Sequence, residues 1–277
     1  MISTRVRRPR TARRSRRESL RRGIYVIPSL FTVGNMLCGF ASVLYALHDQ
    51  LERAAYLIML AGLLDGLDGR IARLTHSTSE FGKEYDSLAD VVSFGVAPAI
   101  LAYQWGLRGL GRWGWGVAFL FLVAGSVRLA RFNVKAGAAD RRFFTGLPIP
   151  TGAGALTLMV LVATTFELQA DRPIAIGAAV FVLLVSILMV STIPYRSGKE
   201  FNLRQRWPAT AFFTIAAVVA VIVFTPVPAL ALLLGAYLVA GPAEYLARRL
   251  RRRRTPQQAP QVQVTSATEA LENPDRS

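Results

Sequence analysis

The chain has 277 residues, of which 52% are hydrophobic, and it carries a formal net charge of +16. Its arginines are gathered in short runs between long apolar stretches, which excludes an ordinary soluble globular domain. Apolar stretches of about 20 residues are long enough to cross a bilayer. A single cysteine, Cys38, excludes an internal disulfide, and its place in an apolar stretch predicts a packing role.

Residues 1–23 are rich in arginine and lead into the first apolar stretch. We interpret them as a disordered cytoplasmic tail that follows the positive-inside rule and touches anionic lipid. A twin-arginine export signal and a nucleic-acid-binding arm are the alternatives. No small-residue cleavage site follows the apolar stretch, and no aromatic interleaving accompanies the arginines. We therefore expect no nucleic acid among the partners.

Eight apolar stretches predict an all-α, polytopic integral membrane protein of about eight transmembrane helices. They are 24–47, 54–73, 83–105, 115–132, 152–166, 174–193, 209–225 and 228–246. Pro98 predicts a kink in the third of them, since proline removes a helical hydrogen bond. With eight spans, every clearly basic loop falls on one side of the membrane, which should be the cytoplasm.

Four aspartates lie near the end of the second apolar stretch and near the start of the third. Asp65 and Asp68 are three residues apart, and Asp86 and Asp90 are four apart, so each pair shares one face of a helix. Carboxylates in a membrane segment are costly unless something neutralises them. Clusters of oxygen ligands suit hard cations such as Mg²⁺ or Mn²⁺. The pattern predicts a metal site at the ends of two membrane helices.

Small residues surround these aspartates. Gly66, Gly69, Ala72 and Gly82 would leave room for a ligand or for a neighbouring backbone. Gly62 and Gly66 also read as a GxxxG pair, which in membrane helices is typical of a packing face. For Gly62 both interpretations stay open.

The aspartate motif resembles the signature of the CDP-alcohol phosphatidyltransferase family, with the same gaps, at Asp65, Asp68, Gly69, Ala72, Arg73, Gly82, Asp86 and Asp90. This resemblance implies an integral membrane enzyme that moves a phosphatidyl group from a CDP-linked lipid to an alcohol and releases CMP. It implies that Asp65, Asp68 and Asp86 hold two Mg²⁺ or Mn²⁺ ions, with Asp90 as general base and further metal ligand. It also implies a homodimer.

Three further runs are similar to the phosphatidylserine synthases within that family. They are residues 25–40, "RLARFN" at 128–133 followed by "FTGLPIP" at 144–150, and "STIPYR" at 191–196. The first departs from the usual pattern at Ser29, and the second is followed by Thr151 and Gly152 in place of alanines. The resemblance implies transfer from CDP-diacylglycerol to L-serine.

The same resemblance suggests which residues bind the substrates. Residues expected around CDP are Thr32, Asn35, Asp65, Gly69, Ala72, Arg73 and Gly82. Arg128 and Arg131 share a helix face and, with Asn133, are candidates for binding the serine carboxylate or the lipid phosphate. An ordinary flank of cytoplasmic arginines is the alternative for the two arginines.

We expect a basic cytoplasmic tail at 1–23, a membrane catalytic domain at 24–247, and a basic, then disordered, cytoplasmic tail at 248–277. Both termini and the active site would face the cytoplasm of a bacterial cell, at its inner membrane. Glycerol 3-phosphate or inositol phosphate as acceptor remains an alternative. A cation transporter is a remote one, since its carboxylates would be spread along several spans.

Overall fold

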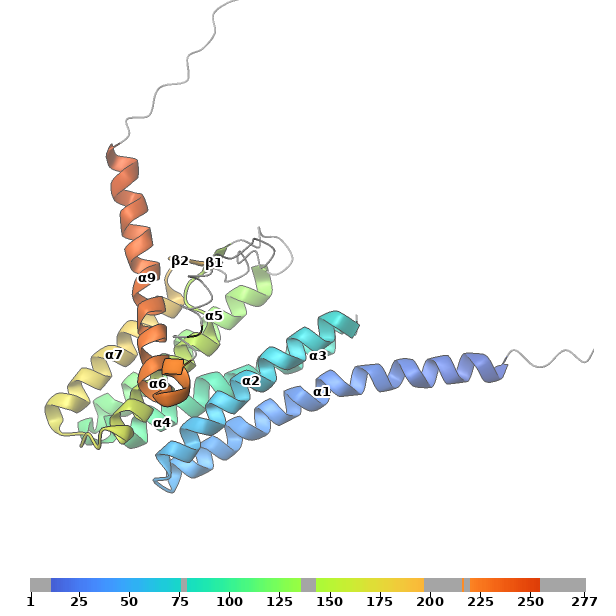
Figure 1. Ribbon diagram of the computed structural model, residues 1–277, viewed down its shortest axis with the longest axis horizontal. Helices are drawn as coiled ribbons and strands as arrows, with labels where there is room; N and C mark the ends of the chain where they lie inside the picture. Colours follow the sequence, from blue (N-terminus) through green and yellow to red (C-terminus); the bar gives the residue numbers. More distant parts are fainter. Residues whose placement is uncertain (1–10, 76–78, 136–142, 197–215, 217–219, 255–277) are drawn as a thin grey trace, which may run out of the picture.

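The computed structural model describes residues 11–75, 79–135, 143–196, 216 and 220–254 of the chain (Figure 1). Nearly all of these residues are helical, as the sequence predicts. The elements in chain order are α1 (Thr11–Leu47), α2 (Leu51–Thr75), α3 (Glu80–Asp90), the π-helix η1 (Val91–Val96), α4 (Ala97–Trp105), the 3₁₀-helix η2 (Leu107–Leu110), α5 (Arg112–Lys135), β1 (Phe143–Thr145), α6 (Ile149–Thr165), α7 (Arg172–Val190), β2 (Pro194–Arg196) and α9 (Pro226–Arg254).

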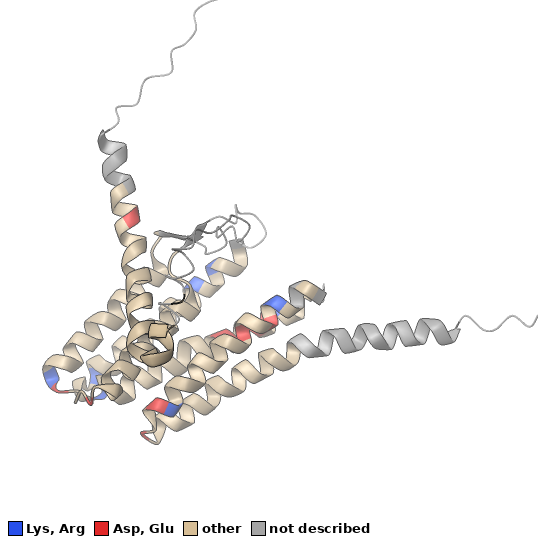
Figure 2. Ribbon diagram, viewed as in Figure 1, with Lys and Arg blue, Asp and Glu red and all other residues tan. Residues whose placement is uncertain are grey.

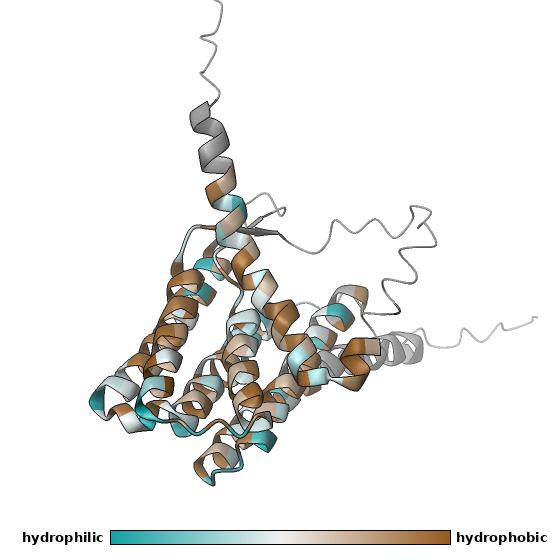
Figure 3. Cartoon of the chain, turned by 60° about the vertical axis from the view of Figure 1, so that its left-hand side comes forward, coloured by the Kyte–Doolittle hydropathy of each residue, from teal (hydrophilic) through white to brown (hydrophobic). Residues whose placement is uncertain are grey.

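Within the described ranges, five helical segments are long and apolar enough to cross a membrane: Ser29–Leu47, Glu80–Trp105, Arg112–Val134, Arg172–Val190 and Pro226–Ala247. Helix α6 is apolar but shorter, and α2 carries two of the aspartates. Figure 3 shows apolar residues along most of each helix and hydrophilic residues mainly near the helix ends. The fold is thus a helical, multi-pass membrane protein. The predicted stretch 209–225 lies largely outside the described residues.

The amino-terminal tail differs from its prediction. Helix α1 begins at Thr11, so residues 11–23 are helical and not disordered. The run from 11 to 22 contains neither glycine nor proline and is rich in arginine, which is a good helix former. Helix α1 therefore extends through this segment, ahead of its apolar part at Ser29–Leu47. The expected disorder of 255–277 concerns residues outside the described part of the chain.

The third predicted span is one continuous helical segment built from α3, η1 and α4. Pro98 lies in the first turn of α4, directly after the π-helical residues. The N–H of Ala97 donates to the carbonyl oxygen of Val92, five residues back. The disturbance expected at Pro98 therefore takes the form of a wider π-helical turn, a known way to insert an irregularity into a helix.

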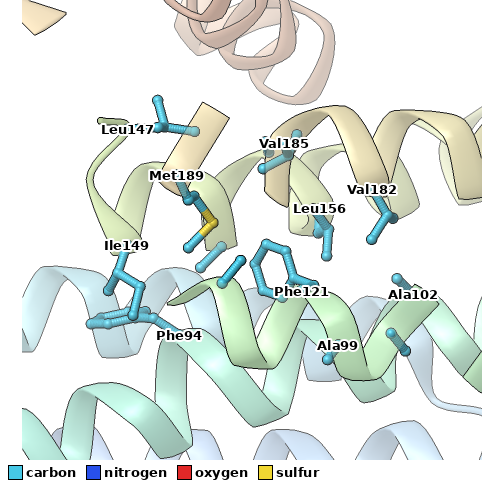
Figure 4. Packing of buried hydrophobic residues seen from close by; sticks show 14 of the residues in the cluster. Phe94, Ala99, Ala102, Phe121, Leu147, Ile149, Leu156, Val182, Val185 and Met189 are labelled. Carbon is cyan, nitrogen blue, oxygen red and sulfur yellow. The ribbon is translucent and has the colours of Figure 1, made fainter. Parts of the chain in front are cut away.

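The main core lies between η1, α5, α6 and α7 (Figure 4). Phe94 from η1 and Phe121 from α5 are fully buried there, together with Leu156 from α6 and Met189 from α7. A second buried cluster joins α1, α2 and α4 through Ala46, Ala54 and Leu101, among others. These two clusters hold the helices that carry the aspartates.

Two short strands form an antiparallel pair, in which Phe143 faces Arg196 and Thr145 faces Pro194. The turn after β1 is tied to the end of α7: Gly146 N donates to Ile193 O at 2.9 Å, and Leu147 N donates to Leu188 O at 3.0 Å. Gly146 has φ +83°, and a Cβ there would lie 2.8 Å from Ser191 O, so only glycine fits. The "FTGLPIP" and "STIPYR" runs are therefore neighbours in space.

Candidate metal and nucleotide site

Three carboxylates, two from α2 and one from α3, meet between these helices. Each of Asp65, Asp68 and Asp86 offers one oxygen, and these oxygens all lie within 4.8 Å of one another. Figure 2 shows acidic residues in the part of the molecule where α2 and α3 overlap in that view. The three-residue spacing of Asp65 and Asp68 places both on the α2 face that meets α3. The structure thus brings together the three aspartates predicted to be the main metal ligands.

No side chain that the structure describes forms an ion pair with these carboxylates, and the side chain of Arg73 is not among those described. One ion pair joins two described side chains, Lys83 Nζ and Glu80 Oε1, at 2.7 Å. It lies on the first turn of α3 and does not involve the three aspartates. Asp68 is 4% exposed, and the buried Oδ1 of Asp86 accepts no hydrogen bond from the described residues. Buried carboxylates so close together repel each other unless a cation neutralises them. The oxygen-only ligand set fits a hard divalent cation.

Asp90 lies one helical turn beyond Asp86 and is not part of that group of three. It is close enough to interact electrostatically with Asp65, Asp86 and Asp68. Its Oδ1 accepts a hydrogen bond from Asn35 Nδ2 at 3.5 Å. Asp90 therefore lies beside the group of three aspartates and has its own hydrogen-bond partner, Asn35. This position suits a general base better than the positions of the three grouped aspartates do.

Helix α1 supplies the polar partners of the aspartates. Thr32 Oγ1 donates to Asp68 Oδ2 at 3.1 Å, and Asn35 is fully buried. Asn35 Oδ1 has no hydrogen-bond partner among the described residues. The two α1 residues expected in the nucleotide pocket, Thr32 and Asn35, therefore lie at the aspartates, and Asn35 Oδ1 could still accept a hydrogen bond there.

Ser93 is a residue of the site that the sequence reasoning missed. It is fully buried in η1, and its Oγ donates to the backbone oxygen of Asn35 at 2.9 Å. The contact is possible because α1 has a glycine there: a Cβ on Gly39 would lie 2.7 Å from Ser93 Cα. Gly39 and Ser93 are 54 positions apart in the chain, so no local pattern signals their contact.

The glycines near the aspartates fall into two groups. A Cβ on Gly66 or Gly69 would meet nothing within 4 Å, so open space lies beside α2 at these positions. A Cβ on Gly62 would instead lie 3.7 Å from the ring of Phe94, which favours the packing interpretation. Gly82 N donates to Ser79 Oγ at 3.0 Å in the first turn of α3. The side chains of Ala72 and Arg73 lie outside the described part.

The three acceptor-site candidates are spread along the end of α5. Arg128 is 7% exposed, and its guanidinium carbon lies 5.3 Å from the centre of the Phe132 ring. Arg131 Nη1 donates to Val190 O at 2.6 Å, at the carboxyl end of α7. Asn133 Nδ2 donates to Ser87 Oγ at 2.8 Å, next to Asp86 in the chain. Of the three, Asn133 is the one that contacts the aspartate helix through a described hydrogen bond.

Comparisons with known proteins agree with this site. A sequence model of the family described as CDP-alcohol phosphatidyltransferase matches residues 25–190. The chain is 37% identical to a CDP-diacylglycerol–serine O-phosphatidyltransferase of Helicobacter pylori over 223 residues, covering 80% of this chain and 92% of the relative. It is 35% identical to the protein of that name from Mycobacterium bovis over 216 residues, 74% of each chain.

A relative from an archaeon carries a different lipid in its name. The chain is 39% identical to an archaetidylserine synthase of Methanothermobacter thermautotrophicus over 173 residues, covering 61% of this chain and 69% of the relative. The matched region of the family model contains all four aspartates and the helices that position them. With the motif, the helical membrane fold and these relatives in agreement, the chain belongs to the CDP-alcohol phosphatidyltransferase family.

Proposed function

We propose that this protein transfers the phosphatidyl group of CDP-diacylglycerol to L-serine, giving phosphatidylserine and CMP. The observation that carries the proposal is the group of three carboxylates, whose oxygens lie within 4.8 Å of one another without a described positive partner. The names of the relatives from Helicobacter and Mycobacterium support serine as the acceptor. The name of the archaeal relative, archaetidylserine synthase, also contains serine, joined to a different lipid.

Asp65, Asp68 and Asp86 would hold the metal, with Asp90 as a further ligand when the site is loaded. Two Mg²⁺ or Mn²⁺ ions fit a ligand set of this kind, and when bound they supply charge neutralisation at the diphosphate and polarise the phosphorus. Thr32 holds Asp68 in place through the hydrogen bond to Oδ2. Helix α1 thus orients one of the ligands before any substrate arrives.

Asp90 is the general base in this proposal. Its carboxylate takes the proton from the hydroxyl of serine, the oxygen forms a bond to the phosphorus of the phosphatidyl group, and the bond to CMP breaks. Asn35 holds Oδ1 of Asp90, which leaves the second carboxylate oxygen for the acceptor. Ser93 in turn fixes the backbone of Asn35.

Open space beside Gly69 would receive the nucleotide, next to Asp65, Thr32 and Asn35. Ala72, Arg73 and Gly82 complete the predicted CDP-binding set. Arg128, Arg131 and Asn133 remain the candidates for the serine carboxylate or the lipid phosphate. Arg128 is buried near the end of α5, and a guanidinium there could bind an anion through two hydrogen bonds.

We further propose that the protein lies in the inner membrane of a bacterium as a homodimer, with both termini and the active site in the cytoplasm. The basic runs that flank the predicted spans support this orientation. The cytoplasm is also where serine is available to the site.

Acceptor choice tests the proposal. Purified protein in detergent receives CDP-diacylglycerol and Mn²⁺ or Mg²⁺, and CMP release is followed with serine, glycerol 3-phosphate or inositol 3-phosphate. We expect release with serine and no release when EDTA is present. Release with a phosphorylated acceptor alone would keep the carboxylate site and refute the serine assignment. No release with any acceptor, from protein that binds Mn²⁺, would refute the transferase proposal.

A further inference from the structure

Ser87 joins the two halves of the candidate site. It follows Asp86 directly in α3, and its hydroxyl donates to Lys83 O at 2.9 Å. The same oxygen accepts the hydrogen bond from Asn133 Nδ2 at 2.8 Å. The bond therefore runs from the helix that carries Asp86 and Asp90 to the helix that carries the acceptor-site candidates.

Asn133 stands two residues before the end of α5, which is a weak part of any helix. The last carbonyl groups of a helix have no partner within it, and helix ends fray. Deeper in the molecule, α5 packs on η1, α4 and α7. At its end, a side-chain bond to a neighbouring helix has more influence on position than one in the packed middle.

The other side of this helix end is tied to α7. Arg131 donates to the carbonyl of Val190, the last residue of α7. Beyond Val190, Ile193 O accepts the N–H of Gly146 in the "FTGLPIP" turn. A series of contacts thus leads from Ser87 through the end of α5 to the two runs that resemble the phosphatidylserine synthases.

We propose that Ser87 is a positioning residue for the acceptor alcohol: it holds Asn133, and so the end of α5, beside Asp86 and Asp90. This inference rests on the proposed function. The acceptor hydroxyl has to reach Asp90 while the rest of the acceptor is bound from α5, so the spacing of α3 and α5 decides how well it fits. Small displacements of reacting groups lower the reaction rate strongly. Apart from Gly82 in the first turn of α3, the nucleotide contacts proposed above come from α1 and α2, so we expect them to depend little on this bond.

The test is a kinetic comparison of variants of the full-length protein. Ser87→Ala should raise the KM for serine about fivefold, the value of one ordinary hydrogen bond. The KM for CDP-diacylglycerol and the affinity for Mn²⁺ should change less than twofold. Ser87→Thr keeps the hydroxyl and should restore the KM for serine. Ser126→Ala is the matched control, because the described hydrogen bond of Ser126, from Oγ to Leu122 O, stays within α5.

A double variant distinguishes this role from general loosening of the structure. Asn133→Ala should raise the KM for serine as Ser87→Ala does, and the combined variant should be no worse than either single one. Additive effects would overturn the proposal. Equal increases in the KM values of both substrates would also overturn it, as would a Ser87→Thr variant that behaves like Ser87→Ala.

Crosslinking tests the contact without any catalysis. Cys38 is the one native cysteine, so Ser87→Cys with Asn133→Cys in a Cys38→Ala background gives a single thiol pair. We expect a short bifunctional thiol reagent to join this pair in membranes. Failure to crosslink would refute the α3–α5 contact even if serine is the acceptor. If the crosslink forms but the native protein does not accept serine, the proposed function is refuted and the α3–α5 contact is supported.

Discussion

Glycine serves opposite purposes in the core and at the carboxylate site. In the core, a Cβ on Gly152 would lie 2.8 Å from Met189 Sδ, and one on Gly125 would lie 3.1 Å from Ile149 Cδ1. At the site, a Cβ on Gly66 or Gly69 would meet nothing within 4 Å. The core glycines allow helices to approach each other, whereas the site glycines border space that the described chain leaves open.

Polar atoms differ between the two regions in the same way. In the core, Thr157 Oγ1 donates to Ala153 O and Ser186 Oγ donates to Val182 O, each at 2.8 Å. At the site, Asn35 Oδ1 and Asp86 Oδ1 are buried without a partner among the described residues. Buried polar atoms are nearly always satisfied in a finished structure. The polar side chains of the core named here are satisfied within their own helices, whereas Asn35 Oδ1 and Asp86 Oδ1 could still accept hydrogen bonds or bind a cation.

The largest effect should come from removing a carboxylate of the group of three. We expect Asp68→Ala to reduce CMP release to background and to abolish Mn²⁺ binding, because the buried ligand is lost while the core is untouched. Metal binding is measured by titration, alongside thermal unfolding. Asp171→Ala is the control, since Asp171 is exposed and lies at the start of α7. Retained Mn²⁺ affinity in Asp68→Ala would refute its place among the ligands.

Asp90 should separate catalysis from metal binding. Asp90→Asn should lower the rate of CMP release by about 100-fold to 10,000-fold, the range for a lost general base. Mn²⁺ affinity should fall far less, because the group of three stays intact. Near-normal turnover in this variant would show that Asp90 is not the base.

A matched pair of glycine variants tests the contrast between the two regions directly. Gly152→Val should reduce the free energy of unfolding by about 1–3 kcal/mol, because the larger side chain overpacks the core. Gly69→Val should leave the unfolding temperature nearly unchanged and raise the KM for CDP-diacylglycerol about tenfold by filling open space. Thermal unfolding in detergent measures the stability of the two variants, and steady-state kinetics measure their KM for CDP-diacylglycerol. A destabilised Gly69→Val with normal KM would contradict this reading of the space.

The smallest effect should come from the partner of Asp68 on α1. Thr32→Val removes the hydrogen bond to Asp68 while keeping the shape of the side chain. We expect about a fivefold loss of Mn²⁺ affinity, corresponding to ~1 kcal/mol. Thr157→Val, which loses a hydrogen bond inside α6, should leave Mn²⁺ affinity unchanged and serves as its control.

Local patterns predicted the helical membrane fold and the pairing of aspartates along a helix, while the count of eight spans stays a prediction. Hydropathy located the apolar helices because the bilayer fixes both their length and their composition. Spacing placed Asp65 with Asp68 on one face of α2, since helix geometry depends on neighbours three and four residues away. The arginine-rich segment was misjudged because charge was taken as a sign of disorder, although the residues from 11 onward are good helix formers.

The tertiary structure alone decided which distant residues meet. No sequence pattern brings Ser93 to Asn35 or Ser87 to Asn133, because these contacts depend on how whole helices pack. The same holds for Asp90, which the spacing pairs with Asp86 but the structure sets apart beside Asn35. The amino-acid sequence determined the helices and the chemistry of the site, because both follow from short-range geometry and residue type. Helix packing determined which side chains orient that chemistry, because it depends on contacts between residues far apart in the chain.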